Sequence, residues 1–131
     1  MVGATSGIGA ALGDRLVEEG SKVIAVGRRQ ERLDDFVRKH GQEKAAAISF
    51  DISDKQGMDA FVAEVTAKHP DFDCVILNAG QQHPVNLAEP AKVDLPRFHA
   101  ELDINFTCMV DLSLKFLPFL MDKKSKTALI L

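Results

Sequence analysis

Three glycines within seven residues constrain the fold of this chain more than any other feature. They stand in the segment Gly3-Ala4-Thr5-Ser6-Gly7-Ile8-Gly9, which follows the apolar pair Met1-Val2 and precedes an amphipathic segment that ends at Gly20. We interpret Met1-Val2 as the end of a strand whose beginning is missing, and the amphipathic segment as a helix. A glycine-rich turn between a strand and a helix presents free backbone N–H groups and the positive end of the helix dipole, which together bind a diphosphate.

Strand and helix patterns alternate along the rest of the chain. Apolar runs predict strands at 22–26, 45–50, 72–77 and 127–131, and 3.6-residue periodicity predicts helices ending at Gly41 and Lys68 and a long helix over 95–121. This alternation predicts the α/β class, with a Rossmann-type, doubly wound, mostly parallel sheet. We expect one NAD(P)-binding domain over residues 1–131, truncated at both ends, so that most of strand 1 and everything after strand 5 are missing.

Periodicity also predicts which face of each helix is buried. The residues expected to face the core are Ile8, Leu12 and Leu16 in the first helix, Leu33, Phe36 and Val37 in the second, Met58, Phe61, Val62 and Val65 in the third, and Leu95, Phe98, Leu102, Phe106, Met109, Phe116 and Leu120 in the long helix.

Composition excludes several classes of function. A formal net charge of −3 and a pI near 5.8 argue against a nucleic-acid partner. No apolar run is expected to approach the roughly 20 residues of a membrane span, and the first residues lack the pattern of a secretory signal. Cys74 and Cys108 lie in apolar segments without metal-ligand spacing, so we expect two reduced, buried thiols in a cytoplasmic protein and no metal.

Each residue of the glycine-rich turn has an expected role. Gly3 permits the tight exit from the strand, Gly7 the close approach of a diphosphate, and Gly9 the packing of the helix on the sheet. Thr5 and Ser6 add hydroxyl donors. The turn lacks the Gly-Lys-Ser/Thr of a P-loop, so the expected ligand is a dinucleotide. The alternative is a tight turn that binds no ligand.

The end of the second strand indicates which dinucleotide is bound. An acidic residue there would bind the ribose hydroxyls of NAD, whereas arginine meets the 2′-phosphate of NADP. The sequence has Gly27-Arg28-Arg29, with no acid at this place. We expect Arg28 to pair with the phosphate and Gly27 to leave room for it, and Arg29 either to assist or to lie in solvent. NADP is therefore the expected cofactor, and NAD is the weaker candidate.

The spacing Gly3, Gly7, Gly9 resembles the short-chain dehydrogenase/reductase family, and further matches follow in the family's order over the whole chain. Asp51 resembles the aspartate that contacts adenine, Leu77-Asn78-Ala79-Gly80 resembles N-N-A-G, and Asn105 stands where the family has its catalytic-site asparagine. Val2 and Leu77 depart from the family pattern. The complete set of residues expected to bind the cofactor is Gly3, Thr5, Ser6, Gly7, Ile8, Gly9, Arg28, Arg29, Asp51, Ile52, Asn78, Ala79 and Gly80.

The resemblance implies hydride transfer between the nicotinamide and a carbonyl or alcohol carbon of a small molecule. In the family a tyrosine transfers the proton, assisted by lysine, serine and the helix asparagine. By this resemblance Asn105 is the only one of the four expected here: the chain contains no tyrosine, and the serine and lysine are expected beyond Leu131. We therefore expect the 131-residue chain to be catalytically inactive. His40 and His69 are expected at the surface, His83 is a candidate for substrate contact, and Glu101 and Asp103 are expected to be solvated helix charges.

Three interpretations remain open at this stage. The chain is an enzyme fragment, a non-catalytic dinucleotide-binding sensor, or a scaffold that folds within an oligomer. The resemblance also implies that the long helix over 95–121 forms a homo-oligomer contact. A central strand reduced to two residues leaves hydrogen-bonding groups unpaired, so we expect low stability.

Overall fold

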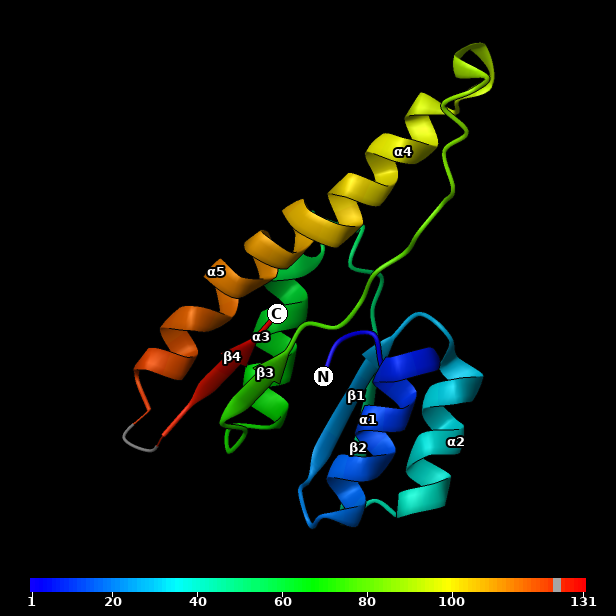
Figure 1. Cartoon of the computed structure of the whole chain (residues 1–131). Helices are drawn as coiled ribbons and strands as arrows, with labels where there is room; N and C mark the ends of the chain where they lie inside the picture. The colour runs from blue at the N-terminus through cyan, green and yellow to red at the C-terminus, as the bar shows by residue number, and fades with distance from the viewer. Residues whose placement is uncertain (124–125) are drawn as a thin grey trace.

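The computed structural model describes residues 1–123 and 126–131, and its elements alternate between strand and helix as the sequence predicts (Figure 1). The strands are β1 (Val23–Gly27), β2 (Ala45–Ser49), β3 (Cys74–Ile76) and β4 (Ala128–Ile130). The α-helices are α1 (Gly7–Glu18), α2 (Gln30–His40), α3 (Met58–Lys68), α4 (Leu95–Leu102) and α5 (Cys108–Met121). A 3-10 turn, η1 (Pro90–Lys92), precedes α4, and a π-helical segment, η2 (Asp103–Thr107), joins α4 to α5.

All the strands are parallel, and Val2 lies at the centre of the sheet. β1 pairs with β2, and β3 pairs with β4. Val2 forms parallel bridges to Val26 of β1 and to Leu77 beyond β3, so that it joins the two strand pairs. The spatial order is therefore β2, β1, Val2, β3, β4, which confirms the predicted Rossmann-type topology.

Two apolar clusters cover the two faces of the sheet. On one face, α1 and α2 pack through a small cluster in which Leu33 and Phe36 are buried, as the periodicity predicts. On the other face, α3 and α5 form the larger cluster, with Met58, Cys108 and Leu112 fully buried. Helices on both faces explain why the strands are apolar on both sides, and confirm that the sheet is doubly wound.

The predicted inward face of α1 is wrong by one position. Ile8 is 79% exposed, and the buried residues are Gly9, Gly13 and Val17. A Cβ on Gly13 would lie 3.0 Å from the Met1 side chain and 3.3 Å from the Phe36 ring. The helix approaches the sheet through these small residues, and the neighbouring Leu12 and Leu16 are only partly buried.

The long helix is continuous from Leu95 to Met121, but its predicted apolar stripe is buried only in its second half. Met109, Phe116 and Leu120 are buried as expected, whereas the predicted core residues of the first half are exposed, namely Leu95, Phe98, Leu102 and Phe106. Figure 1 shows that this first half of the long helix extends away from the sheet, where none of the other described helices lies beside it.

This helix is also long and apolar enough to cross a membrane, so the expectation that no segment approaches such a span is wrong. Its composition alone does not distinguish a membrane helix from a core helix. In α5 six residues are buried in the domain, namely Cys108, Met109, Leu112, Ser113, Phe116 and Leu120. This burial is that of a core helix packed against a sheet and against α3.

The side chain of His40 is buried, which corrects its expected place at the surface. Its Nε2 lies 2.6 Å from a carboxylate oxygen of Asp14 in α1, and Lys39 Nζ lies 2.7 Å from the other oxygen. The hydrogen bonds from Lys39 and His40 hold the pKa of Asp14 below its usual value. These contacts join the outer helices α1 and α2 to each other.

Both cysteines are free thiols. Cys108 is buried and Cys74 is half-buried, and burial raises the pKa of both thiols.

Candidate functional site

A cavity of about 580 Å³ lies at the carboxyl ends of the parallel strands, at the edge where dinucleotides bind in doubly wound folds. Twelve of the residues predicted from the sequence line it, namely Gly3, Thr5, Ser6, Gly7, Ile8, Arg28, Arg29, Asp51, Ile52, Asn78, Ala79 and Gly80. Gly9 and Asn105 are not among its lining residues. The structure therefore brings together predicted residues that are up to 77 positions apart in the sequence, from Gly3 to Gly80.

The three glycines of the turn serve different geometric needs. Gly3 has a φ of +84°, and a Cβ there would lie 2.6 Å from the backbone of Ala79. A Cβ on Gly9 would lie 2.0 Å from the carbonyl oxygen of Gly3, because the turn packs directly against the start of the helix at this point. Gly7 has a φ of +55° and no atom within 4 Å of its Cβ position, so it faces open space in the cavity. Gly3 and Gly9 therefore permit packing, and Gly7 leaves room for a ligand.

The beginning of α1 has backbone N–H groups available for an anion. Ser6 precedes the helix and makes no side-chain capping hydrogen bond. The first helical bond runs from Ala10 N–H to the carbonyl of Ser6, at 3.3 Å, so the N–H groups of residues 7–9 precede any helical partner. An open cradle with free N–H groups and a helix dipole behind it fits the diphosphate of a dinucleotide.

Arg29 contacts the turn, and its expected part in binding the cofactor stays a prediction. Its Nη2 donates to Thr5 Oγ1 at 3.0 Å and to Ser6 Oγ at 2.5 Å, and its Nε donates to Thr5 Oγ1 at 3.3 Å. Gly27 was expected to leave room for a phosphate, but its Cβ position lies 2.5 Å from Thr5 Cγ2. Gly27 therefore makes room for the Thr5 side chain, and the guanidinium of Arg29 holds the turn from outside.

Arg28 lies across the cavity edge from Asp51. Its Nη1 is 3.6 Å from a carboxylate oxygen of Asp51, and both side chains are exposed. Burial by itself would raise the pKa of Asp51, but hydrogen bonds from Ser53 N–H and Oγ, together with the charge of Arg28, outweigh it and lower the pKa. Asp51 is thus held as a carboxylate, and Arg28 presents a cation toward the same space.

The Asn105 side chain fastens the loop that follows β3. Its Oδ1 accepts the N–H of Gln81 at 2.8 Å, and its Nδ2 donates to the carbonyl of Gln81 at 2.7 Å. Asn105 lies in the π-helical segment η2, and such segments often occur at functional sites. Both polar groups of the amide therefore bond to the main chain beside Gly80, which is a positioning contact.

Comparison with known proteins agrees with this geometry. The sequence model for short chain dehydrogenase matches residues 1–131. The chain belongs to the short-chain dehydrogenase family. Serine 3-dehydrogenase of Agrobacterium fabrum is 35% identical over 124 residues, covering 95% of this chain and 49% of that protein. The NADP-dependent 3-hydroxy acid dehydrogenase of Salmonella typhi is 29% identical over 123 residues, covering 94% of this chain and 48% of that protein.

Solved structures of the family also match. A serine dehydrogenase in its closed form, complexed with NADP⁺, superposes with a TM-score of 0.84 at 26% identity, covering 97% of this chain and 50% of that one. This short-chain dehydrogenase sequence thus spans about half the length of the curated relatives it matches.

Sequence reasoning did not assign four lining residues to the cavity of this short-chain dehydrogenase chain, namely Val2, Phe50, Gln81 and Ile104. Gln81 lines the cavity and bonds to Asn105 through its backbone, which no side-chain pattern could indicate. Glu101 accepts the His83 backbone N–H at 2.6 Å and lies 3.2 Å from His83 Nδ1, so it is not the solvated helix charge expected. Asp103 accepts a bond from Lys55 at 2.5 Å, and both side chains are partly exposed, as expected for a charge on the helix face. His83 lines a separate cavity of about 320 Å³ against α4, and its expected contact with substrate stays a prediction.

Proposed function

We propose that this chain is the NADP(H)-binding domain of an oxidoreductase that transfers hydride between the nicotinamide and a carbonyl or alcohol carbon. Family membership supports a nicotinamide dinucleotide and chemistry at a hydroxyl group. The observation that carries the preference for NADP(H) is the pair of arginines directly after β1, one facing Asp51 and one bonded to Thr5 and Ser6. The matching 3-hydroxy acid dehydrogenase is named as NADP-dependent, and the matching serine dehydrogenase structure is a complex with NADP⁺, which is consistent with this proposal.

The proposed roles follow the cavity from one end to the other. The N–H groups of residues 7–9 bind the diphosphate, and Gly3 and Gly9 keep the turn close to the sheet. Arg28 pairs with the 2′-phosphate through charge-assisted hydrogen bonds, and Arg29 holds the hydroxyls of the turn. Asp51 and Ile52 line the adenine end, while Asn78, Ala79 and Gly80 line the nicotinamide end.

The bound cofactor would supply the hydride, and the chain's own residues would bind and orient it. Asn105 would act through the loop after β3, because its amide holds the main chain of Gln81 next to Gly80. The 131 residues contain no tyrosine to transfer the proton. We propose that the chain is part of an enzyme and by itself binds NADPH without turnover. The alternatives to an enzyme fragment are a non-catalytic dinucleotide sensor and a scaffold. A scaffold need not bind the cofactor, so the titration below separates it from the other two.

Replacing Arg28 should abolish most of the preference for NADPH. In Arg28→Ala we expect the dissociation constant for NADPH to rise about 10- to 100-fold and that for NADH to change little, because one charge-assisted contact contributes about 1.5–3 kcal/mol. Isothermal titration with both cofactors measures this. Arg32→Ala is the matched control, since Arg32 is exposed on α2 and does not line the cavity. Equal affinity of the unsubstituted chain for NADPH and NADH would contradict the proposal.

We also propose that the long helix mediates association with a second copy. Leu95, Leu102 and Phe106 expose 51–69% of their surface on one continuous helix, which is unusual for large apolar side chains of a monomer. Sedimentation equilibrium tests this proposal, and a mass of one chain at micromolar concentration would contradict it.

The two free thiols support a reducing, cytoplasmic location, which cell fractionation tests.

A further inference from the structure

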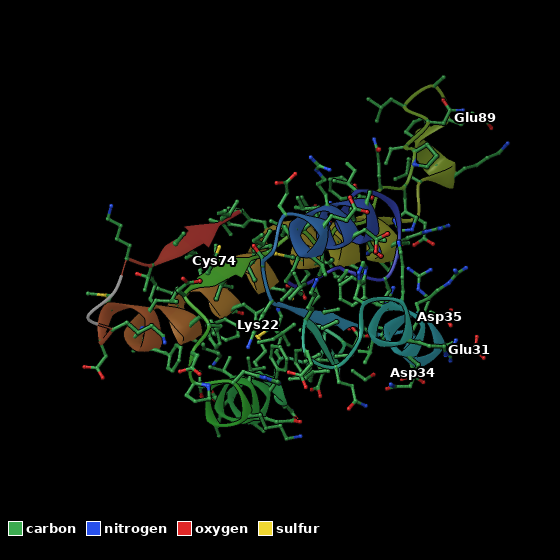
Figure 2. All side chains as sticks on the ribbon, turned by 90° about the horizontal axis from the view of Figure 1, so that it is seen from below. Lys22, Glu31, Asp34, Asp35, Cys74 and Glu89 are labelled. Carbon is green, nitrogen blue, oxygen red and sulfur yellow. The ribbon has the colours of Figure 1, made fainter. Side chains whose placement is uncertain are left out.

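A second cavity lies beside α4, apart from the one at the carboxyl ends of the strands. Its volume is about 320 Å³, and none of the described residues that line it also lines the larger cavity of about 580 Å³. The loop that follows β3, the 3-10 turn η1 and the first turn of α4 form its walls. In Figure 1, η1 lies beyond the outer end of α4, and Figure 2 labels Glu89 in the same outlying segment. This cavity is therefore separate from the proposed cofactor site.

Hydrogen bonds hold both ends of the loop wall in place. At one end, Glu101 Oε2 of α4 accepts the backbone N–H of His83 at 2.6 Å and lies 3.2 Å from His83 Nδ1. At the other end, Asn86 Oδ1 accepts the N–H of Ala88 at 3.1 Å, and the Asn86 carbonyl accepts the N–H of Glu89 at 3.2 Å. The wall is thus formed before any ligand binds, which lowers the entropic cost of binding.

The acidic side chains of the lining are engaged within the wall. Glu89 forms an ion pair with Lys92 and accepts a hydrogen bond from Asn86 Nδ2 at 3.3 Å. Asp94 Oδ1 accepts the backbone N–H of Arg97 at 3.0 Å, which caps α4. In the described part of the chain, by contrast, the guanidinium of Arg97 has no acidic partner within ion-pair distance. One positive charge in the lining is therefore left for a ligand.

Apolar side chains supply the rest of the lining. They are Pro84, Val85, Val93 and Phe98, of which Val85 is 39% and Phe98 38% exposed. Ligand pockets commonly combine an apolar wall with a few polar groups, and this cavity is at the small end of their usual range of roughly 300–1,000 Å³. It therefore fits a ligand with one negative charge and a short apolar chain.

We propose that this cavity binds a small aliphatic carboxylate, whose two oxygens pair with the guanidinium of Arg97 and whose hydrocarbon chain packs against the apolar wall. The planar guanidinium matches the two oxygens of a carboxylate, which gives charge-assisted hydrogen bonds. A phosphate dianion fits less well, because Glu89 and Asp94 place two negative charges on the same wall. The site is independent of the proposed function, which uses only the larger cavity.

Titration of the full chain with sodium propionate, followed by NMR of the backbone amides, tests this proposal. Sodium chloride at the same concentration is the reference for ionic strength. We expect saturable shifts at Val85, Val93 and Phe98 with a Kd of about 1–10 mM, a usual range for a ligand with so few atoms. Propionamide has the same size and no charge, so it should bind about tenfold more weakly or less. Inorganic phosphate should also bind more weakly than propionate.

Replacing Arg97 tests its part in the site. Arg97→Gln keeps a long polar side chain and removes the charge, so we expect the Kd for propionate to rise about tenfold or more. Arg38→Gln is the matched control, because Arg38 pairs with Asp35 on α2, outside the cavity, and should leave the Kd unchanged. Amide peaks outside the cavity should coincide with those of the unsubstituted chain in both variants, which shows that both fold.

Any of four results would overturn the proposal. Propionamide binding as tightly as propionate would mean that the cavity does not recognise charge, and phosphate binding more tightly would mean that the class of ligand is wrong. An unchanged Kd in Arg97→Gln would mean that Arg97 is not the partner. Shifts confined to the amides of Gly7 and Arg28 would place propionate in the larger cavity. None of these readouts involves the cofactor, so failure here is distinct from failure of the proposed function.

Discussion

The Gly9→Ala variant is expected to be less stable than the unsubstituted chain by about 1–3 kcal/mol, because the added methyl group overpacks the junction of turn and helix. A Cβ at this position would lie 2.0 Å from the carbonyl oxygen of Gly3 and 2.6 Å from the side-chain nitrogen of Asn78. Either the turn or α1 must move, and the N–H groups that face the cavity move with it. We therefore expect NADPH affinity to fall together with the urea midpoint of unfolding.

The matched control for this variant is Gly7→Ala. Gly7 has no atom within 4 Å of its Cβ position, so its substitution costs only the left-handed backbone conformation, roughly 1–2 kcal/mol. Helix propensity alone favours alanine over glycine inside a helix by about 1 kcal/mol. If Gly9→Ala were as stable as the unsubstituted chain or more so, propensity would outweigh packing, and the close contact of α1 with the turn would be wrong.

The Leu112→Ala variant is expected to lose about 2–5 kcal/mol of unfolding free energy, the usual cost of removing a buried leucine side chain and leaving a cavity. Leu112 has 0% exposure in the cluster between the sheet, α3 and α5. A small domain has a total stability of only about 5–15 kcal/mol, so this single change removes a large share of it. Denaturant titration followed by circular dichroism measures the loss.

Leu114 is the control on the same helix. It is 62% exposed, so Leu114→Ala should change stability by less than about 0.5 kcal/mol. Equal losses at the two positions would contradict the observed orientation of α5. The comparison matters because the long helix is apolar on more than one side, and its composition does not show which side meets the sheet.

Local patterns in the sequence predicted most of the fold and most of the candidate site. The glycine-rich turn, the arginines after β1, and the segments at Asp51 and Asn78 are each readable within a few residues. Because they all follow strands of one parallel sheet, they meet at the same edge, and the cavity there is lined by twelve of the predicted residues. The family assignment followed from the order of these segments and is confirmed.

Contacts between distant side chains could not be predicted in this way. Arg29 and Thr5 are 24 positions apart, as are Asn105 and Gln81, and their hydrogen bonds depend on how loops leave the strands. The burial of His40 depends on Asp14 of a neighbouring helix. These partners carry no shared motif, so only the path of the folded chain shows that they meet.

The sequence by itself determined the alternation of strands and helices, the glycine-rich turn and the class of ligand that the turn can hold, because these depend on local backbone preference and on the period of apolar residues. The tertiary structure decided which apolar faces are covered. Periodicity predicted burial equally for Leu102 of α4 and Phe116 of α5, yet Leu102 is 51% exposed and Phe116 is buried. The physical reason is that an apolar face is buried only where another element covers it, and α5 lies against the sheet whereas α4 extends beyond it (Figure 1).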